Sequence, residues 1–171
     1  MCYNSGMSVS IRPYSDDLAR RFAVEKARLG DILGTDIPVK HVGSSAVGIG
    51  GKNIVDILVG AENAEEMMRI RDALAENGYF EGGDSHDDRI FMASSLDETG
   101  EGDFHVHICL VGSETYADFL RLRDFLRKNH DRAQEYLMKK QEFAKLAGFD
   151  RKRYKALKAE YVARLLEEAR K

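Results

Sequence analysis

The sequence predicts a mixed α/β (α+β) fold in a single domain, and three observations support this. The chain has 171 residues, of which 43% are hydrophobic, and this suffices for one core of ordinary size. Short runs rich in β-branched residues are followed by helical stripes in the first part of the chain. Residues 113–171 show helical periodicity alone. We therefore expect one domain over residues 1–171, with a C-terminal helical segment packed on a sheet.

One helix is predicted before the first strand. Residues 1–10 have no periodicity, so we expect a ragged start. Arg12 precedes a proline, which favours an extended backbone at that point. Ser15 and the two aspartates after it predict a helix start, because a capping hydroxyl and acidic groups stabilise a helix N-terminus. The apolar stripe that follows predicts a helix to about Gly34.

Two predicted strands, residues 39–42 and 54–59, flank a glycine-rich loop. Its glycines are Gly43, Gly48, Gly50 and Gly51. A further helix is predicted after the second strand, with Asn63 as its cap and Asn77-Gly78 as its end. The resulting order is strand, loop, strand and helix.

The second half of the chain predicts a hairpin and then helices. Residues 89–95 and 103–111 read as two antiparallel strands joined by a turn at 96–102. Alternation along the second strand places His105 and His107 on one face. Beyond Ser113 the stripes predict three helices, for which Asp131 and Asp150 are plausible N-caps.

Composition predicts a cytoplasmic protein. No apolar run approaches the ~20 residues of a membrane-spanning helix, and the first residues lack the basic and apolar regions of a signal peptide. Two cysteines, Cys2 and Cys109, make a poor disulfide framework. The oligomeric state cannot be predicted from these features.

Charge is distributed unevenly along the chain. Residues 121–171 carry 16 Lys and Arg against 8 Asp and Glu, whereas the preceding residues carry 10 against 21. The basic tail could consist of solvated helix faces, or it could form an anion-binding wall for phosphates or nucleic acid. Its basic residues are not interleaved with aromatic residues, so we expect a phosphorylated small molecule rather than nucleic acid as partner.

The turn Gly43-Ser44-Ser45 suits a phosphate. A Gly-Ser turn that leaves a strand exposes backbone N–H groups and a hydroxyl without crowding by a Cβ atom. The loop matches neither the dinucleotide-binding fingerprint nor the P-loop, because Gly51-Lys52 is followed by Asn53. A purely structural turn is the alternative interpretation.

The spacing around this turn resembles a known signature. A hydrophobic residue and Gly43-Ser44 are followed by eleven residues and then by Asp56 within a strand, which resembles the nucleotidyltransferase superfamily. Within that superfamily, the stretches His-Val-Gly-Ser-Ser-Ala-Val-Gly and Gly-Lys-Asn-Ile-Val-Asp-Ile-Leu-Val resemble the GrpB family. Further matches are Tyr14, Arg89, Phe91, His105, His107, residues 123–127, Tyr136, Tyr154 and Lys158.

This resemblance implies a mixed β-sheet flanked by helices, with a nucleotide or a similar phosphorylated compound bound near Gly43 and Ser44. It also implies that Asp56 is the catalytic carboxylate, at the position where Mg²⁺ is bound. The candidate phosphate-binding or nucleotide-binding residues are His41, Gly43, Ser44, Ser45, Lys52, Arg89, Arg127 and Lys158.

The sequence departs from the superfamily pattern at one position. Active members have two alternating carboxylates that hold Mg²⁺ between them, but here the second position is Leu58. Two functions therefore stay open. The chain could carry out metal-dependent nucleotidyl transfer, or it could be a binding or helper module that kept the fold, as GrpB-like domains fused to dephospho-coenzyme A kinase suggest.

The remaining polar groups allow several interpretations. His105 and His107 could hold a transition metal together with Asp56. They could also contact a phosphate or a base, or be satisfied polar residues on a sheet face. Asp56 itself could simply be neutralised by Arg89 on a neighbouring strand.

Overall fold

The computed structural model describes residues 9–83, 85–94, 104–148 and 150–171. The predicted turn at 96–102 and nearly all of the predicted ragged start lie outside these ranges. The helices are α1 (Asp17–Leu33), α2 (Gly43–Val47), α3 (Ala64–Glu76), α4 (Glu114–Lys128), α5 (His130–Ala147) and α6 (Arg151–Ala169). The strands are β1 (Val39–Val42), β2 (Val55–Ala61), β3 (Tyr79–Glu81), β4 (Arg89–Ser94) and β5 (Phe104–Leu110).

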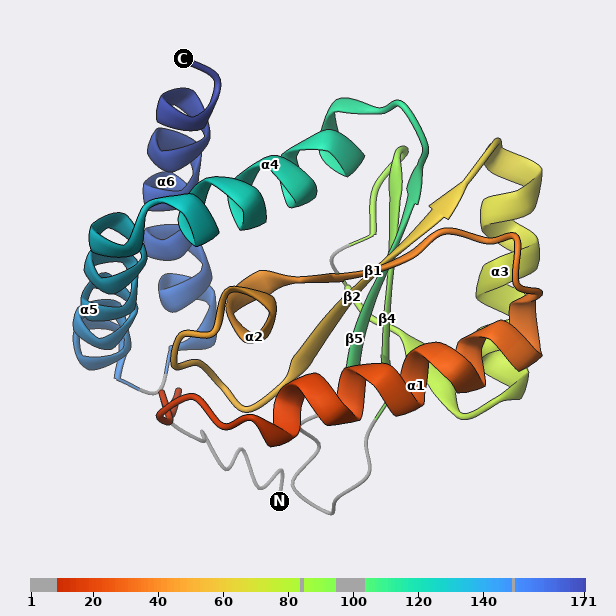
Figure 1. Cartoon of the computed structure of the whole chain (residues 1–171), viewed down its shortest axis with the longest axis horizontal. Helices are drawn as coiled ribbons and strands as arrows, with labels where there is room; N and C mark the ends of the chain where they lie inside the picture. Colours follow the sequence, from red (N-terminus) through yellow and green to blue (C-terminus); the bar gives the residue numbers. More distant parts are fainter. Residues whose placement is uncertain (1–8, 84, 95–103, 149) are drawn as a thin grey trace, which may run out of the picture.

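The strands form one mixed sheet in the order β1-β2-β5-β4-β3. β1 pairs antiparallel with β2, and β4 and β5 form the predicted antiparallel hairpin. β2 and β5 run parallel at the centre of the sheet. Helices α1 and α3 contact one face, α2 and α4 contact the other, and α5 and α6 pack beside α4 (Figure 1). The predicted mixed sheet flanked by helices is thus confirmed.

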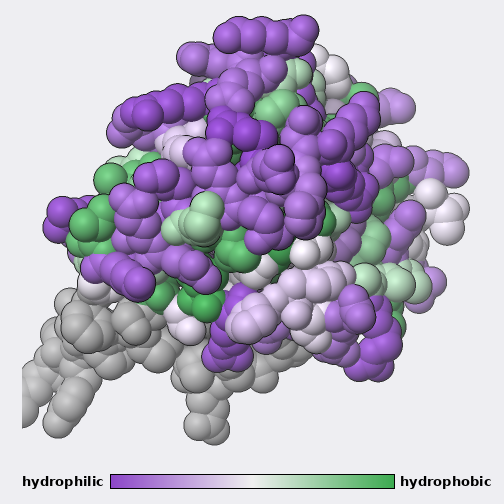
Figure 2. All heavy atoms as spheres, turned by 60° about the vertical axis from the view of Figure 1, so that its left-hand side comes forward, coloured by the Kyte–Doolittle hydropathy of each residue, from purple (hydrophilic) through white to green (hydrophobic). Residues whose placement is uncertain are grey.

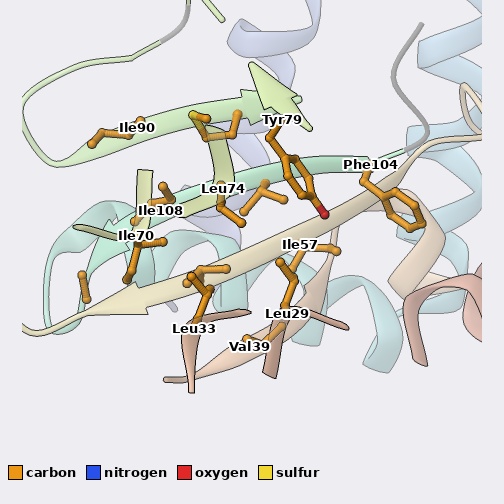
Figure 3. Packing of buried hydrophobic residues seen from close by; sticks show 14 of the residues in the cluster. Leu29, Leu33, Val39, Ile57, Ile70, Leu74, Tyr79, Ile90, Phe104 and Ile108 are labelled. Carbon is orange, nitrogen blue, oxygen red and sulfur yellow. The ribbon is translucent and has the colours of Figure 1, made fainter. Parts of the chain in front are cut away.

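The face of the sheet under α1 and α3 forms the larger core. Alternation along β2 points Ile57 and its neighbours two residues away toward these helices, where they are buried. Figure 3 shows Ile57 beside Leu29 of α1, with Leu74 of α3 nearby. Fully burying a side chain of this size stabilises the fold by roughly 1.5–3 kcal/mol. This face is therefore committed to stability.

The opposite face of the sheet carries a smaller apolar cluster and the polar residues of interest. Leu58, Val42 and Cys109 are fully buried there and pack against α4. Asp56 and His105 share this face, because Asp56 lies two residues from Leu58 on β2 and His105 lies four residues from Cys109 on β5. Phe91 of β4 shares it as well, because it pairs with His107, which lies two residues from Cys109. Polar groups thus share this face with the apolar cluster that packs against α4.

Most predicted helix ends are confirmed. The Asn63 and Asp150 side chains accept hydrogen bonds from the backbone N–H groups of Glu66 and Arg153. Asn129 separates α4 from α5 and is the N-cap of α5, so the prediction of an N-cap at Asp131 is wrong and α5 begins two residues earlier than that cap would allow. Sequence periodicity gave no indication of the three-residue strand β3, because so short a segment shows no repeat.

The C-terminal helices present a largely hydrophilic surface. Figure 2 shows the side of the molecule that carries them, where polar side chains predominate and hydrophobic ones are scattered. None of the helices in the described part of the chain combines the length and the apolar character that a membrane span requires.

Candidate functional site

The Gly43–Ser44 turn lies directly against Asp56. Gly43 begins α2 with φ of +71°, a conformation that favours glycine. A Cβ atom at this position would lie 2.4 Å from Asp56 Oδ2. The two halves of the sequence motif, which a long loop separates in the chain, therefore meet in space, and only glycine permits the contact.

Asp56 faces two imidazoles. It is aligned with His105 across the parallel β2–β5 pair. Its Oδ1 lies 3.6 Å from His105 Nδ1 and 3.7 Å from His107 Nε2. Burial by itself would raise the pKa of Asp56, but the two histidines outweigh it and hold that pKa well below its ordinary range. The carboxylate is ionised across the physiological range, and its side chain remains 29% exposed.

His107 is held among aromatic rings. Its ring centroid lies 4.6 Å from that of Phe119 on α4 and 5.3 Å from that of Phe91 on β4. Phe91 also contacts the edge of His105 at 5.0 Å. Burial lowers the pKa of His107, although Asp56 acts in the opposite direction. Its buried Nδ1 atom has no hydrogen-bond partner among the residues that the structure describes. Phe91 and Phe119 thus surround a neutral imidazole rather than a permanent cation.

A buried lysine, Lys140, contacts the Gly43–Ser44 turn, and it was not among the predicted site residues. Lys140 of α5 is 2% exposed, and its Nζ donates to Ser44 Oγ at 2.7 Å and to the carbonyl oxygen of Gly50. Nζ also lies 4.9 Å from the centroid of the Tyr136 ring. Burial, together with a smaller effect of the charge of Lys158, lowers the pKa of Lys140 to about 7, although Asp56 acts in the opposite direction. No local motif marks this residue, because tertiary packing alone brings it to Ser44.

His41 and Ser45 contact each other. His41 Nε2 lies 2.9 Å from Ser45 Oγ, and the imidazole stacks on Phe22 with centroids 4.3 Å apart. Burial lowers the pKa of His41 to about 4, with Asp56 opposing this effect and Arg127 and a second arginine adding to it. His41 is therefore neutral, and this pair stabilises the start of α2.

The arginines of α4 hold the same segment by its backbone. Arg123 Nη1 donates to the carbonyl oxygen of His41 at 3.1 Å, and Arg127 Nε donates to that of Ala46 at 2.9 Å. The contact of Arg127 with a phosphate remains a prediction. Its Nε already donates to a backbone carbonyl oxygen of α2. Both arginines therefore hold α2 in its position.

The remaining predicted phosphate ligands differ in position. Lys158 is close enough to influence the charge of Lys140. Lys52 Nζ lies 5.1 Å from the Tyr154 ring centroid, on the side where α6 packs. Arg89 is aligned with Cys109, four residues along the sheet from the row that contains Asp56 and His105. The structure therefore brings Lys158 toward the site but does not place Arg89 beside the Gly43–Ser44 turn, and histidines rather than Arg89 contact Asp56.

The available ligands do not fit Mg²⁺. Asp56 is the one carboxylate on this part of β2, and Leu58, two residues further on, is completely buried against α4. Imidazoles are poor ligands for this hard cation, which prefers oxygen. Across the described ranges, no group of three or more His, Cys, Asp or Glu side chains is arranged to hold a metal ion. The prediction of a transition metal at Asp56, His105 and His107 gains no support from this arrangement.

Ion pairs neutralise part of the basic tail. Arg132 pairs with Glu135 and Glu168, and Arg170 Nη2 lies 2.9 Å from Asp118 Oδ2. These pairs join the C-terminal helices to one another. They favour paired, solvated helix faces over a continuous anion-binding wall.

The fold is that of the nucleotidyltransferase superfamily. The Cid1 poly(U) polymerase, solved with Mg and 3'-dATP bound, aligns with a TM-score of 0.55 and 15% identity over 79% of this chain and 43% of that one. At this level of identity the likeness shows the fold alone.

The chain belongs to the GrpB family, whose model, described as GrpB protein, matches residues 8–168. A UPF0157 protein of Pseudomonas aeruginosa is 31% identical over 94% of this chain and 67% of its own length. The crystal structure of the conserved protein GrpB from Enterococcus faecalis aligns with a TM-score of 0.81 and 24% identity, covering 94% of this chain and 96% of that one. The chain spans only part of such curated relatives, from 40% of the length of the UPF0157 protein YqkA of Bacillus subtilis to 67% of that of the Pseudomonas aeruginosa protein.

Proposed function

We propose that this protein binds a nucleotide or a similar phosphorylated compound, with the phosphates over the Gly43–Ser44 turn. One observation carries the proposal: the positive φ of Gly43 seats the turn on the Asp56 carboxylate, where a Cβ atom would approach within 2.4 Å. A merely connecting turn would not require such close packing against a charged group. Membership of the GrpB family and the fold that it shares with Cid1 agree with this proposal.

Charge balance also supports a phosphate-binding role. An anion beside ionised Asp56 is repelled unless cations lie nearby. Lys140 donates to Ser44 Oγ, and Lys158 is near enough to act on Lys140. The site thus has cationic groups close to the turn.

Calorimetry with ATP, GTP, CTP and UTP, each with and without Mg²⁺, tests the proposal. We expect the unaltered protein to bind at least one nucleotide, and Gly43→Ala to lose most of this affinity, because the added methyl group displaces the turn from Asp56. Gly30→Ala is the matched control, since a Cβ atom there meets nothing within 4 Å. The proposal is wrong if the unaltered protein binds neither a nucleotide nor tripolyphosphate, or if Gly43→Ala folds and binds as tightly as Gly30→Ala.

Metal-dependent nucleotidyl transfer is a second candidate, and one observation favours it. The pKa of Asp56 is held well below its ordinary range, so a carboxylate is available at the position that the superfamily uses. The buried Leu58 at the position of the second acid favours binding without transfer. Incorporation of α-labelled nucleotide into any acceptor, abolished by Asp56→Asn, would decide for transfer. Binding that needs no Mg²⁺ and survives Asp56→Asn would decide for the binding or helper module.

A further inference from the structure

Lys140 is a buried cation that pairs with no carboxylate in the described part of the chain. Its side chain is 2% exposed, and its hydrogen-bond acceptors within the described residues are a hydroxyl and a carbonyl oxygen, both uncharged. An ammonium group in such a place costs free energy, which native proteins usually offset with an ion pair. An anion bound at the adjacent turn would supply the missing counter-charge.

The contact with Ser44 determines what the Ser44 hydroxyl can do. A charged lysine has three N–H donors and no acceptor. Because Nζ donates to Ser44 Oγ at 2.7 Å, the hydroxyl hydrogen must point to another acceptor. No acceptor for that hydrogen is found among the residues that the structure describes, and Ser44 is partly exposed. The lysine therefore orients Ser44 as a donor toward whatever occupies the turn.

The groups around Lys140 come from three elements. Lys158 of α6 disfavours a second positive charge, Asp56 of β2 favours it, and the Tyr136 ring of α5 lies 4.9 Å from Nζ. Burial raises the pKa of Tyr136 well above its ordinary value, so this phenol is neutral. A bound phosphate would add a negative charge to this set and shift the balance toward the charged lysine.

We propose that Lys140 is the counter-charge of the bound phosphate, that it orients Ser44 as a hydrogen-bond donor, and that it takes up a proton when the ligand binds. This inference rests on the function proposed above and extends it to a residue of the C-terminal helices. Lys140 acts on the ligand through Ser44, so it is a positioning residue.

The direction of the pH dependence follows from the geometry and the charges. Burial holds the pKa of Lys140 at about 7 in the free protein. A bound anion raises that pKa, so binding is strongest where the lysine is already charged. Affinity for a phosphate compound falls as pH rises above about 7, by at most about tenfold per pH unit for a single proton.

The experiment is calorimetric titration with tripolyphosphate and ATP between pH 7.5 and 9, in buffers of different ionisation enthalpy. We expect the unaltered protein to take up part of a proton per ligand. Lys140→Met should bind at least tenfold more weakly and take up correspondingly less. Lys140→Arg, which is always charged, should bind with little dependence on pH. Lys26→Met, the same change on the exposed face of α1, is the matched control.

Thermal melts of each variant show that it is folded. The melts restrict the comparison of binding to folded variants, since Lys140→Met removes a buried charge but also the donor to the carbonyl oxygen of Gly50. The inference is overturned if folded Lys140→Met binds like Lys26→Met, or if the unaltered protein binds without taking up more protons than Lys140→Met. Failure of the unaltered protein to bind either compound would overturn the proposed function and this inference together.

Discussion

Two carboxylates, Glu25 and Asp56, lie on opposite faces of the sheet and differ in how they are neutralised. Glu25 of α1 is 5% exposed, accepts a hydrogen bond from the Tyr79 hydroxyl and pairs with Arg28 at 2.8 Å. Arg28 also donates to the carbonyl oxygen of Asn77 at 2.6 Å. A permanent cation and a phenol thus satisfy this carboxylate and join α1 to the segment between α3 and β3.

Asp56 has weaker and more distant partners. Its side chain is 29% exposed, against 6% for that of Glu25. Its two imidazole partners lie beyond ordinary hydrogen-bond distance, and the pKa of one of them, His107, is lowered by burial. The comparison shows that a carboxylate in a folded protein can be fully satisfied by its neighbours or left open to a further partner. Asp56 is of the second kind.

The largest expected effect comes from giving Asp56 a second acidic neighbour. Leu58→Asp places a charge where the side chain is 0% exposed and packed against α4. We expect the free energy of unfolding at pH 7 to fall by about 4 kcal/mol or more, since a cavity and an unpaired buried charge arise together. Denaturation with urea measures this change. A stable Leu58→Asp protein whose melting temperature rises with added Mg²⁺ would contradict our view that this face does not fit the metal.

Removing the charge of Glu25 should have the next largest effect. Glu25→Gln leaves Arg28 without its ion-pair partner and the Tyr79 hydroxyl with a weaker acceptor, so we expect a loss of about 2–3 kcal/mol in unfolding free energy. Nucleotide affinity should be unchanged where the protein is folded, as isothermal calorimetry can check. A selective loss of binding would break the distinction between the two carboxylates.

Asp56→Asn should change stability less, and mainly its dependence on pH. The pKa of Asp56 is lower in the folded than in the unfolded state, so its contribution is present above the unfolded value of about 3.8 and is lost as pH falls through and below it. We expect a loss of about 1 kcal/mol at pH 7, moderated by the partial exposure of the side chain, and a flatter decline between pH 5 and 3. Urea midpoints across that range test this, and an unchanged acid limb would contradict it.

Tyr79→Phe should have a smaller effect on stability than Glu25→Gln, close to that of Asp56→Asn. It removes only the hydroxyl that donates to Glu25, while Arg28 remains in place. A single hydrogen bond to a charged group contributes about 1.5 kcal/mol, so we expect a loss of about 1–1.5 kcal/mol in thermal or urea unfolding. A loss as large as that of Glu25→Gln would mean that the phenol, rather than Arg28, is the main partner of the carboxylate.

The sequence predicted the parts of this molecule that depend on local order. Capping at Asn63, the stop at Asn77-Gly78 and the alternation that puts His105 and His107 on one face are all properties of neighbouring residues. The spacing between Gly43 and Asp56 predicted the fold through resemblance to a known family, and the contact between them agrees with it.

What could not be predicted depends on packing between distant segments. Nothing in the sequence around Lys140 distinguishes it from the other lysines of the tail, and only the packing of α5 against α2 and its loop brings it to Ser44. Likewise, the sequence allows Asp56 to pair with Arg89, and only the strand register shows that they lie in different rows of the sheet. The strands place His105 beside Asp56 and Arg89 four residues away.

The contact between Lys140 and Ser44 also has a consequence for the order in which the protein forms. The two residues are 96 positions apart in the chain. At a synthesis rate of about 5–20 residues per second, the turn leaves the ribosome roughly 5–20 seconds before its lysine. Contacts of such long range form slowly, because closing the loop costs entropy before the contact is made. The nascent protein therefore carries the turn and Asp56 before Lys140 reaches Ser44, and this contact forms only when the last helices dock.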